Sequence, residues 1–461
     1  MRPAVEAEKM GIPSVVIATS GFPALARVLA KSSGIDGLRI AEYPGVLGID
    51  TAEQIRAKFE TQVLDSINEG LTKETGSNGI ARPHMSRRTA DIVHRGTLQD
   101  INDFFQLKEW SDGLAIIPPT LERVHEFLSY TDRAPDEEIA VLPPSNMRAV
   151  PMNIAANAVM AGCRPQDMPI LIATARALAD DQCNLYNAGS TSGIVPFVVI
   201  NGPIVRELGI EAGGQLISRG PNPAIGRAIG LIVKNIAGFR PGQNYMGTFG
   251  YPLVFTLAED EELTPWEPFH VEQGFPRGAN TVTVGVTNNW GPSSEPSMTP
   301  DKTAAEVALE LLCREIPKKF RVYDFPTIGP KAETVMVTLV LSPSVARLLA
   351  DAGYDKRMIR EYVYENARMP LREFDWITTY TFPRGLTARQ KAEAGLLPPE
   401  FMGQPDDMVR VLKGPEIVHI LVCGDPNRNR LMSFEGGHTV PTTYEIELPA
   451  SWRTLLRERN K

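Results

Sequence analysis

Apolar and polar positions alternate along the first 73 residues with the spacings of helices and strands. The pattern predicts helices over residues 2–10 and 21–31, buried strands over 14–18 and 38–42, and a long helix that begins at Thr51. Thr51 and Gln54 have the spacing of a capping box, and the helix carries one apolar stripe at Ile55, Phe59, Val63, Ile67 and Leu71. Helices that alternate with strands in this way indicate a parallel sheet.

This N-terminal unit begins on a helix, with no strand before it. A two-stranded parallel sheet leaves one strand edge and one apolar face uncovered, which isolated domains rarely tolerate. We therefore expect another polypeptide, or a natural start upstream of Met1, to supply the rest of the layer. Strands from later in the chain are the alternative.

The later apolar runs predict two further α/β units. The expected fold class is α/β, with an incomplete parallel, Rossmann-like unit over residues 1–73, a linker over 74–100, a mixed α/β central domain over 101–325 and a C-terminal α/β unit over 326–461. Strands are expected over residues 113–120, 195–200, 253–259, 281–286, 336–344 and 417–424, and helices over 121–130, 221–234 and 304–314.

Two of these segments share a short pattern. Pro119, Thr120 and Arg123 follow one expected strand, and Pro343, Ser344 and Arg347 follow another. The pattern is consistent with an internal duplication, but Pro-Thr and Pro-Ser also form ordinary helix caps, so both interpretations stay open.

Composition and charge narrow the functional class. The chain has 461 residues and 43% hydrophobic content. A chain of this length normally folds around more than one hydrophobic core. The net charge of −8, without a basic stripe, argues against nucleic acid as a partner. No leader and no apolar run of membrane-spanning length are present, so we expect no membrane association and a cytoplasmic location.

Four cysteines lie far apart, with no Cys-x-x-Cys motif and no paired histidines: Cys163, Cys183, Cys313 and Cys423. This spacing predicts free thiols and neither a disulfide framework nor a structural metal site. Cys163 stands at a Gly-Cys-Arg-Pro break, where a thiolate can have a lowered pKa. The usual fate of a lone cysteine in an apolar segment is inert packing, so Cys163 is either a nucleophile or a core residue.

The densest polar chemistry follows the strand expected over residues 253–259. Six ionisable side chains crowd there around Trp266: Glu259, Asp260, Glu261, Glu262, Glu267 and His270. Neighbouring carboxylates can serve as acid and base, and with a histidine they can hold a divalent metal, whereas the ordinary alternative is an exposed acidic turn. Trp266 would bury part of this loop, which favours Glu259 and His270 as proton-transferring residues and Trp266 as a substrate contact.

An anion site is expected at the start of the helix over residues 221–234. Asn222 opens the helix and Arg227 follows, so a planar guanidinium fork accompanies free helical N–H groups. No phosphate-loop lysine and no complete dinucleotide motif are present, so the sequence identifies no cofactor. We expect a small carboxylate or carbonyl compound as ligand, with Asn201 after the strand over 195–200 as a further contact.

Two other histidines are weaker candidates for a functional site. His84 lies in the basic linker and is more typical of a solvated surface residue. His438 follows two glycines, a setting that suits a site loop or a hairpin equally well.

Several blocks of the sequence resemble the UGSC-motif (seleno)protein family, which is named for a Cys- or selenocysteine-Gly-Ser-Cys motif. Residues 5–22 are similar to the segment just after that motif. The long domain that accompanies it is similar to residues 157–165, 198–204, 222–235 and 259–275, with their Asn-Gly-Pro, Ile-Gly-Arg and Pro-Trp-Glu-Pro pieces. The motif itself would lie upstream of Met1, so the resemblance implies a small partner subunit that carries it, or a longer natural N-terminus.

The resemblance implies thiol-based chemistry without naming a substrate. Our first hypothesis is a subunit of a hetero-oligomeric enzyme that performs thiol-assisted redox or carbon–heteroatom bond cleavage on a small carboxylate-bearing substrate. Arg227 would bind an anion, Glu259 or His270 would move a proton, and Cys163 or a partner thiol would attack. The alternatives are a metal-assisted hydrolase or lyase at Glu259, Glu262 and His270, and a non-catalytic stabilising subunit.

Overall fold

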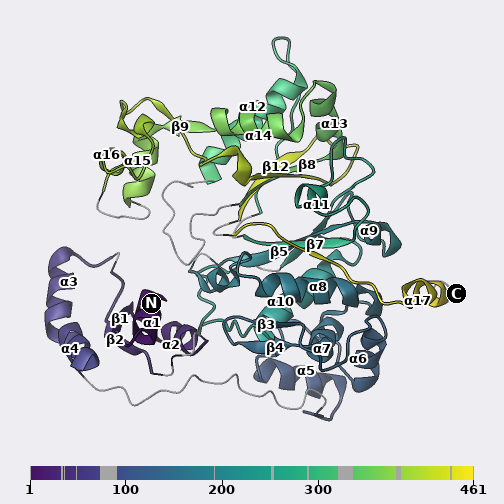
Figure 1. Ribbon diagram of the computed structural model, residues 1–461, viewed down its shortest axis with the longest axis horizontal. Helices are drawn as coiled ribbons and strands as arrows, with labels where there is room; N and C mark the ends of the chain where they lie inside the picture. Colours follow the sequence, from purple (N-terminus) through teal and green to yellow (C-terminus); the bar gives the residue numbers. More distant parts are fainter. Residues whose placement is uncertain are drawn as a thin grey trace. The chain divides into compact units, whose positions relative to one another are not determined.

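The computed structural model describes residues 2–32, 35, 37–47, 49–72, 91–191, 193–250, 254–287, 290–319, 336–380, 386–436 and 439–459. These residues form a mixed α/β protein, as expected (Figure 1). The chain divides into two compact units, each built from several stretches. The first unit comprises Met1–Met168, Leu185–Ile194 and Ala228–Pro252, and the second comprises Pro169–Asn184, Val195–Arg227 and Leu253–Lys461. The four-part division at residues 73, 100 and 325 stays a prediction.

The N-terminal segment of the first unit alternates helices and strands as expected. Its elements are α1 (Arg2–Lys9), β1 (Val15–Thr19), α2 (Pro23–Ser32), β2 (Arg39–Tyr43), α3 (Ala52–Lys58), the π-helical turn η1 (Phe59–Val63) and α4 (Leu64–Thr72). β1 and β2 pair in parallel, from Val15 opposite Arg39 to Thr19 opposite Tyr43. Among the described residues this sheet has only these two strands, and the incomplete, Rossmann-like character of the unit stays a prediction.

The capping box and the apolar stripe account for the long helical segment after Thr51. The Thr51 hydroxyl accepts from the Gln54 N–H, and the Gln54 side chain accepts from the Thr51 N–H, so the helix begins where the sequence predicts. The stripe then packs on β2, with Val63 against Ala41 and Tyr43.

One edge of β1 carries backbone groups that β2 does not use. The Ser20 N–H donates to the Tyr43 carbonyl oxygen at 3.0 Å. Since backbone groups point to alternate edges along a strand, Val15 and Ile17 direct theirs to the opposite edge. The side chain of Ile17 is exposed, and a hollow of about 290 Å³ follows residues 16–19 and the first turn of α2. An added strand could pair along this edge.

Short helices and one hairpin complete the first unit. They are α5 (Leu98–Leu107), α6 (Leu121–Leu128), β3 (Ala140–Leu142), β4 (Met147–Ala149), α7 (Pro151–Ala161), η2 (Pro165–Asp167), η3 (Leu185–Gly189) and the second half of α10 (Asn222–Asn235). The helix expected over residues 121–130 is present. Thr97 caps α5, which begins at Leu98 and so overlaps the last residues of the segment expected as a linker.

The strand expected over residues 113–120 is wrong. Pro118 and Pro119 have no N–H to give to a ladder, and the Asn102 side chain binds the backbone of Ile116 instead. Asn102 Oδ1 accepts from the Ile116 N–H at 2.7 Å, and Asn102 Nδ2 donates to the Ile116 carbonyl oxygen at 3.4 Å. Because this copy of the repeated pattern lacks its strand, the structure gives no support to a duplication.

Two sheets form the centre of the second unit. The first has the order β13-β7-β5-β6, with β5 (Val195–Asn201), β6 (Phe255–Ala258), β7 (Thr281–Thr287) and β13 (Thr442–Glu445). The second has the order β11-β8-β12, with β8 (Met336–Leu341), β11 (Val418–Val422) and β12 (Leu431–Gly436). β5 is parallel to β6 and antiparallel to β7, and all seven of its residues are buried.

Aromatic side chains join these two sheets. Phe434 of β12 packs edge-on against Phe197 of β5, with ring centroids 4.9 Å apart, and against Phe255 of β6 at 5.9 Å. β12 and β13 therefore belong to different sheets and do not form a hairpin with each other. His438 lies between them, outside the described residues.

Helices cover the outer face of the β8–β12 sheet in Figure 1, where α12 (Ala304–Lys319), α13 (Pro343–Asp351) and α14 (Lys356–Asn366) lie on one side of it. Their apolar residues and those of β8 and β11 share one core. The other elements of this unit are α8 (Met168–Ala179), α9 (Ile204–Glu207), α11 (Phe269–Glu272), β9 (Arg368–Pro370), α15 (Leu371–Tyr380), α16 (Ala388–Glu393), η5 (Pro399–Met402), β10 (Met408–Arg410), η6 (Pro415–Ile417) and α17 (Trp452–Arg459).

Gly226 allows α10 to approach the start of β6 closely. A Cβ atom at Gly226 would lie 2.2 Å from the Val254 carbonyl oxygen. Replacing glycine by alanine inside a helix normally stabilises it by about 1 kcal/mol. Here we expect Gly226→Ala to lower the free energy of unfolding by about 1–3 kcal/mol, because the backbone has to move apart. Urea unfolding measures the change. Gly214→Ala, which meets only ordinary contacts, is the control, and a more stable Gly226→Ala variant would contradict the close approach.

Candidate functional site

A polar cluster lies at the carboxyl ends of β5 and β6 in the second unit. Ile200 pairs with Ala258, so Asn201, the last residue of β5, and Glu259, which follows β6, stand at neighbouring positions. Ligands of α/β proteins commonly bind at this end of parallel strands. We call Asn201, Glu259, Glu261 and His270 the buried polar cluster.

Glu259 is the most enclosed member, with 2% of its surface exposed. Its Oε2 accepts from Asn201 Nδ2 at 2.7 Å and from the Phe269 N–H at 2.6 Å, and its Oε1 accepts from the Val422 N–H at 3.4 Å. Burial raises the pKa of Glu259, although Lys356 and the three hydrogen bonds act in the opposite direction. The acid form of this carboxyl is therefore favoured relative to an exposed glutamate.

Glu261 lies beside it and remains partly accessible. Its Oε1 accepts from the Gly202 N–H at 2.6 Å and from Asn201 Nδ2 at 3.1 Å. Gly202 adopts a φ of 100°, and a Cβ there would lie 2.3 Å from the Ala279 carbonyl oxygen. Glycine is thus required for the turn that directs this N–H at Glu261.

His270 is fully buried and faces Glu261. Its Nε2 lies 3.2 Å from the Pro276 carbonyl oxygen, which can only accept, so Nε2 carries a hydrogen. Burial lowers the pKa of His270, which favours the neutral ring with a lone pair on Nδ1. That Nδ1 lies 3.5 Å from Glu261 Oε1, so two acceptors face each other. A proton shared between these atoms would satisfy both.

Two buried atoms of the cluster lack a hydrogen-bond partner in the described part of the chain: His270 Nδ1 and Asn201 Oδ1. Buried polar atoms are rarely left in this state, and such exceptions occur at functional sites. Asn201 Nδ2 donates to Glu259 and Glu261, so its amide orientation is determined by the two carboxyls.

Lys356 and Trp266 hold the loop that carries the cluster. Lys356 Nζ donates to the Glu267 carbonyl oxygen at 2.8 Å and to Glu272 Oε2 at 2.9 Å. Trp266 Nε1 donates to the Tyr354 carbonyl oxygen at 3.0 Å. These contacts tie the loop and α11 to the start of α14. The role of Trp266 in substrate binding stays a prediction.

The structure does not bring Asn222 into the cluster. Its Nδ2 donates to the carbonyl oxygens of Glu211 and Thr256, at 2.9 and 3.2 Å, and its Oδ1 accepts from the Glu211 N–H at 2.9 Å. The side-chain amide of Asn222 therefore makes its hydrogen bonds to the backbone of Glu211 and Thr256.

Arg227 lies still further along the helix. α10 starts near Thr256 and passes Val254 at Gly226, so it runs toward the beginning of β6, whereas Glu259 follows the end of that strand. The pairing of Arg227 with the buried polar cluster, which the sequence suggested, is not supported by this geometry.

The crowded acidic loop divides into inward and outward carboxylates. Glu259 and Glu261 point into the cluster, whereas Glu262 pairs with Arg206 and Glu267 pairs with Arg277 at the surface. Among the described residues, no three His, Cys, Asp or Glu side chains are grouped in a way that could hold a metal ion. The metal-binding set of Glu259, Glu262 and His270 therefore finds no support in this arrangement.

The four cysteines differ in their surroundings, and none of them forms a disulfide. Cys183, Cys313 and Cys423 are buried, and burial raises the pKa of each thiol, to about 12 for Cys183 and Cys313. Cys163 is only partly buried and follows Gly162, which ends α7 in a left-handed conformation. It belongs to the first unit, whereas the cluster belongs to the second, so their cooperation stays a prediction.

Sequence reasoning found some members of the site and missed others. Asn201 and Glu259 were found because each follows a buried strand. Gly202 was visible only as part of a turn, and Lys356 gave no signal because its partners are far away in the sequence. His84 lies outside the described residues.

The fold and the cluster define a mixed α/β protein with a buried carboxyl and a buried imidazole at the ends of parallel strands. The model of the UGSC family matches residues 1–73, so this segment is similar to that family. Searches of curated proteins and of solved structures returned no match. Within the described residues, no helix has both the length and the apolar character needed to cross a membrane.

The raised pKa of Glu259 predicts a pH-dependent stability. The folded state keeps its proton above the ordinary pKa of 4.5, whereas the unfolded state has lost it. Protonated Glu259 therefore contributes its full stabilisation to the fold below pH 4.5. This stabilisation is lost as the pH rises through the folded-state pKa of Glu259. We expect Glu259→Gln to gain stability relative to the wild type between about pH 5 and pH 8, by up to ~1.4 kcal/mol per pH unit.

Urea unfolding of both proteins at the two pH values measures this difference. His270 contributes with the opposite sign in both proteins, and to a first approximation it cancels. Glu267→Gln removes an exposed carboxylate of the same loop, and its effect should stay within about 0.5 kcal/mol at both values because solvent screens its ion pair. A Glu259→Gln advantage that shrinks as the pH rises would contradict the direction of the shift.

Proposed function

We propose that this chain is the acid–base subunit of a thiol-dependent enzyme that cleaves a carbon–heteroatom bond in a small carboxylate-bearing substrate. The observation that carries the proposal is the buried polar cluster. Burial favours the neutral form of both Glu259 and His270, so an acid that can give a proton lies in the same cluster as an imidazole that can accept one.

The two groups have separate roles in this proposal. Glu259 is the proton donor, because its carboxyl keeps its proton to a higher pH than an exposed glutamate does. His270 is the proton acceptor, through an Nδ1 that has no hydrogen-bond partner in the described part of the chain. Asn201 orients the two carboxyls through Nδ2 and offers its Oδ1 to a polar group of the substrate.

The thiol comes either from Cys163 or from a partner subunit. The raised pKa values of Cys183, Cys313 and Cys423 argue against a thiolate at these positions. A partner that carries a Cys- or selenocysteine-Gly-Ser-Cys motif is supported by the family match over residues 1–73. The edge of β1 opposite β2 pairs with no other described strand, so it offers such a partner, or a longer natural N-terminus, a place to pair.

The bond changes follow from these roles. The thiolate attacks the carbon that bears the heteroatom, a carbon–sulfur bond forms, and the carbon–heteroatom bond breaks with its electron pair on the leaving group. Glu259 supplies the proton that neutralises this leaving group. Water then attacks the same carbon and gives a proton to His270, while the carbon–sulfur bond breaks with its electron pair on sulfur and restores the thiolate. The metal-assisted alternative has less support, since Glu262 pairs with Arg206 instead of facing His270.

We expect Glu259→Gln to lower turnover by about 100-fold or more, since glutamine keeps the shape but cannot donate the proton. The chain is produced together with the reading frame directly upstream, so that the complete assembly is assayed. Small carboxylates with an α- or β-leaving group are the substrates, and release of the leaving group is the measurement. Glu267→Gln, in the same loop but directed to the surface, should stay within about twofold of the wild type.

Two treatments distinguish the alternatives in the same assay. Alkylation with iodoacetamide should abolish turnover, and excess chelator should leave it unchanged. Loss of turnover with chelator would favour metal-assisted chemistry. Turnover that survives both alkylation and Glu259→Gln would mean that the cluster is structural and that this chain only stabilises its partner.

A further inference from the structure

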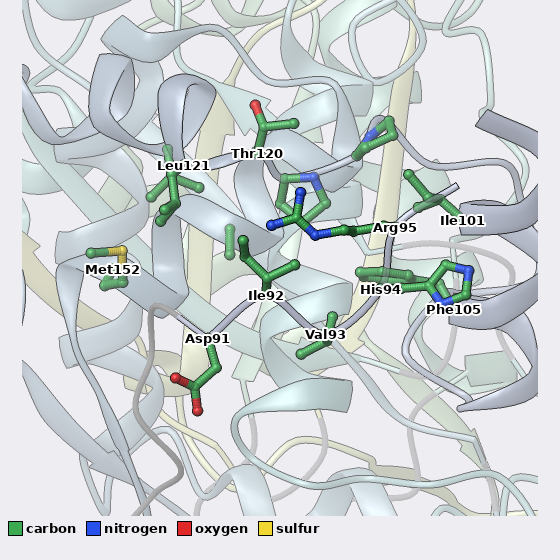
Figure 2. A pocket seen from close by; sticks show the side chains of 14 residues that line it. Asp91, Ile92, Val93, His94, Arg95, Ile101, Phe105, Thr120, Leu121 and Met152 are labelled. Atoms are coloured by element: carbon green, nitrogen blue, oxygen red, sulfur yellow. The ribbon is translucent and has the colours of Figure 1, made fainter. Parts of the chain in front are cut away.

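A pocket in the first unit has no role in the proposed function. Its volume is about 360 Å³, the space of roughly a dozen water molecules. It lies between the extended residues 91–95, α5, α7 and the Pro118-Pro119-Thr120 turn that leads into α6 (Figure 2). The size falls within the range of small-molecule sites, ~300–1,000 Å³.

The walls of this pocket are held in place by specific contacts. The His94 ring stacks on the Phe104 ring, with centroids 4.4 Å apart and planes 8° from parallel, which fixes residues 91–95 against α5. On the other wall Thr120 caps α6 through the Arg123 N–H at 3.4 Å. These two contacts hold opposite walls of the pocket.

The lining is apolar apart from a few side chains. Val124 and Phe105 are buried beneath it, whereas Ile92 keeps 61% of its surface exposed beside it. Val93 and Leu121 also line the pocket and stay exposed, at 48% and 44%, and exposed apolar residues that adjoin one another mark binding surfaces. The lining therefore favours a ligand with an apolar tail.

Arg95 supplies the charge. Figure 2 shows its guanidinium reaching across the cavity between Ile92 and Thr120, while the carboxylate of Asp91 points away from it. The guanidinium fork matches a carboxylate in shape and charge. The ring of His94 is occupied by its stacking on Phe104.

We propose that this pocket binds a small amphipathic monocarboxylate, with its carboxylate on Arg95 and a short branched or aromatic tail against Phe105 and Val124. The site is independent of the proposed function, because none of its residues belongs to the buried polar cluster. Failure of one proposal therefore leaves the other untouched.

Benzoate and isovalerate are the probes, and benzamide is the uncharged control of the same shape. Calorimetric titration of the full chain should give a dissociation constant of about 0.1–1 mM for benzoate, with benzamide at least about tenfold weaker. Arg95→Gln should weaken benzoate by about tenfold and leave benzamide unchanged. Arg133→Gln removes an exposed arginine of the same unit, paired with Glu137, and should change benzoate binding by less than about twofold.

A second variant tests the location without touching the charge. Ala156→Phe places a ring in the cavity and should abolish binding of both probes, with folding checked by its urea midpoint. Equal affinities for benzoate and benzamide would overturn the anionic class of ligand. Binding that survives Ala156→Phe, or that is unaffected by Arg95→Gln, would overturn the site. No benzoate binding, together with self-association that Ile92→Glu abolishes, would instead identify the surface as a protein contact.

Discussion

The arrangement of the second unit depends on one buried carboxyl. Removing Glu259 from water is unfavourable, and the cost is offset by donors from three separate segments: the Asn201 amide at the end of β5, the Phe269 N–H at the start of α11 and the Val422 N–H in β11. The Asp260 N–H adds a bond to the Val422 carbonyl oxygen at 2.9 Å. One side chain thus fixes the ends of strands from both sheets, and any shift of one segment would leave a buried polar atom without its partner.

Local sequence patterns were sufficient to predict most helices and strands. They failed where a side chain distant in the sequence forms the hydrogen bonds of a segment. The Thr51 cap, the charge-free β5 and the paired β1 and β2 were all predictable, because their causes lie within a few residues of one another. The strand expected over residues 113–120 failed because Asn102 takes the hydrogen bonds that a neighbouring strand would have made. No pattern within that segment reveals this competitor.

The candidate site shows the same division. Asn201 and Glu259 could be placed together since each follows a buried strand, and parallel strands end at the same edge. Arg227 could not be placed, because the sequence gives the position of α10 but not its direction along β6. The supporting role of Lys356 depends on how α14 packs against α11, which no local spacing encodes.

The uneven burial of the four thiols gives the folded chain an internal set of reporters. Cys163, the partly accessible one, belongs to the first unit, while Cys183, Cys313 and Cys423 all lie within the second. A thiol reagent meets mainly Cys163 while the fold is intact, and the other three become available only as the second unit opens. Mass spectrometric counting of labels over time would therefore follow the opening of the second unit, after the early labelling of Cys163, without any engineered probe.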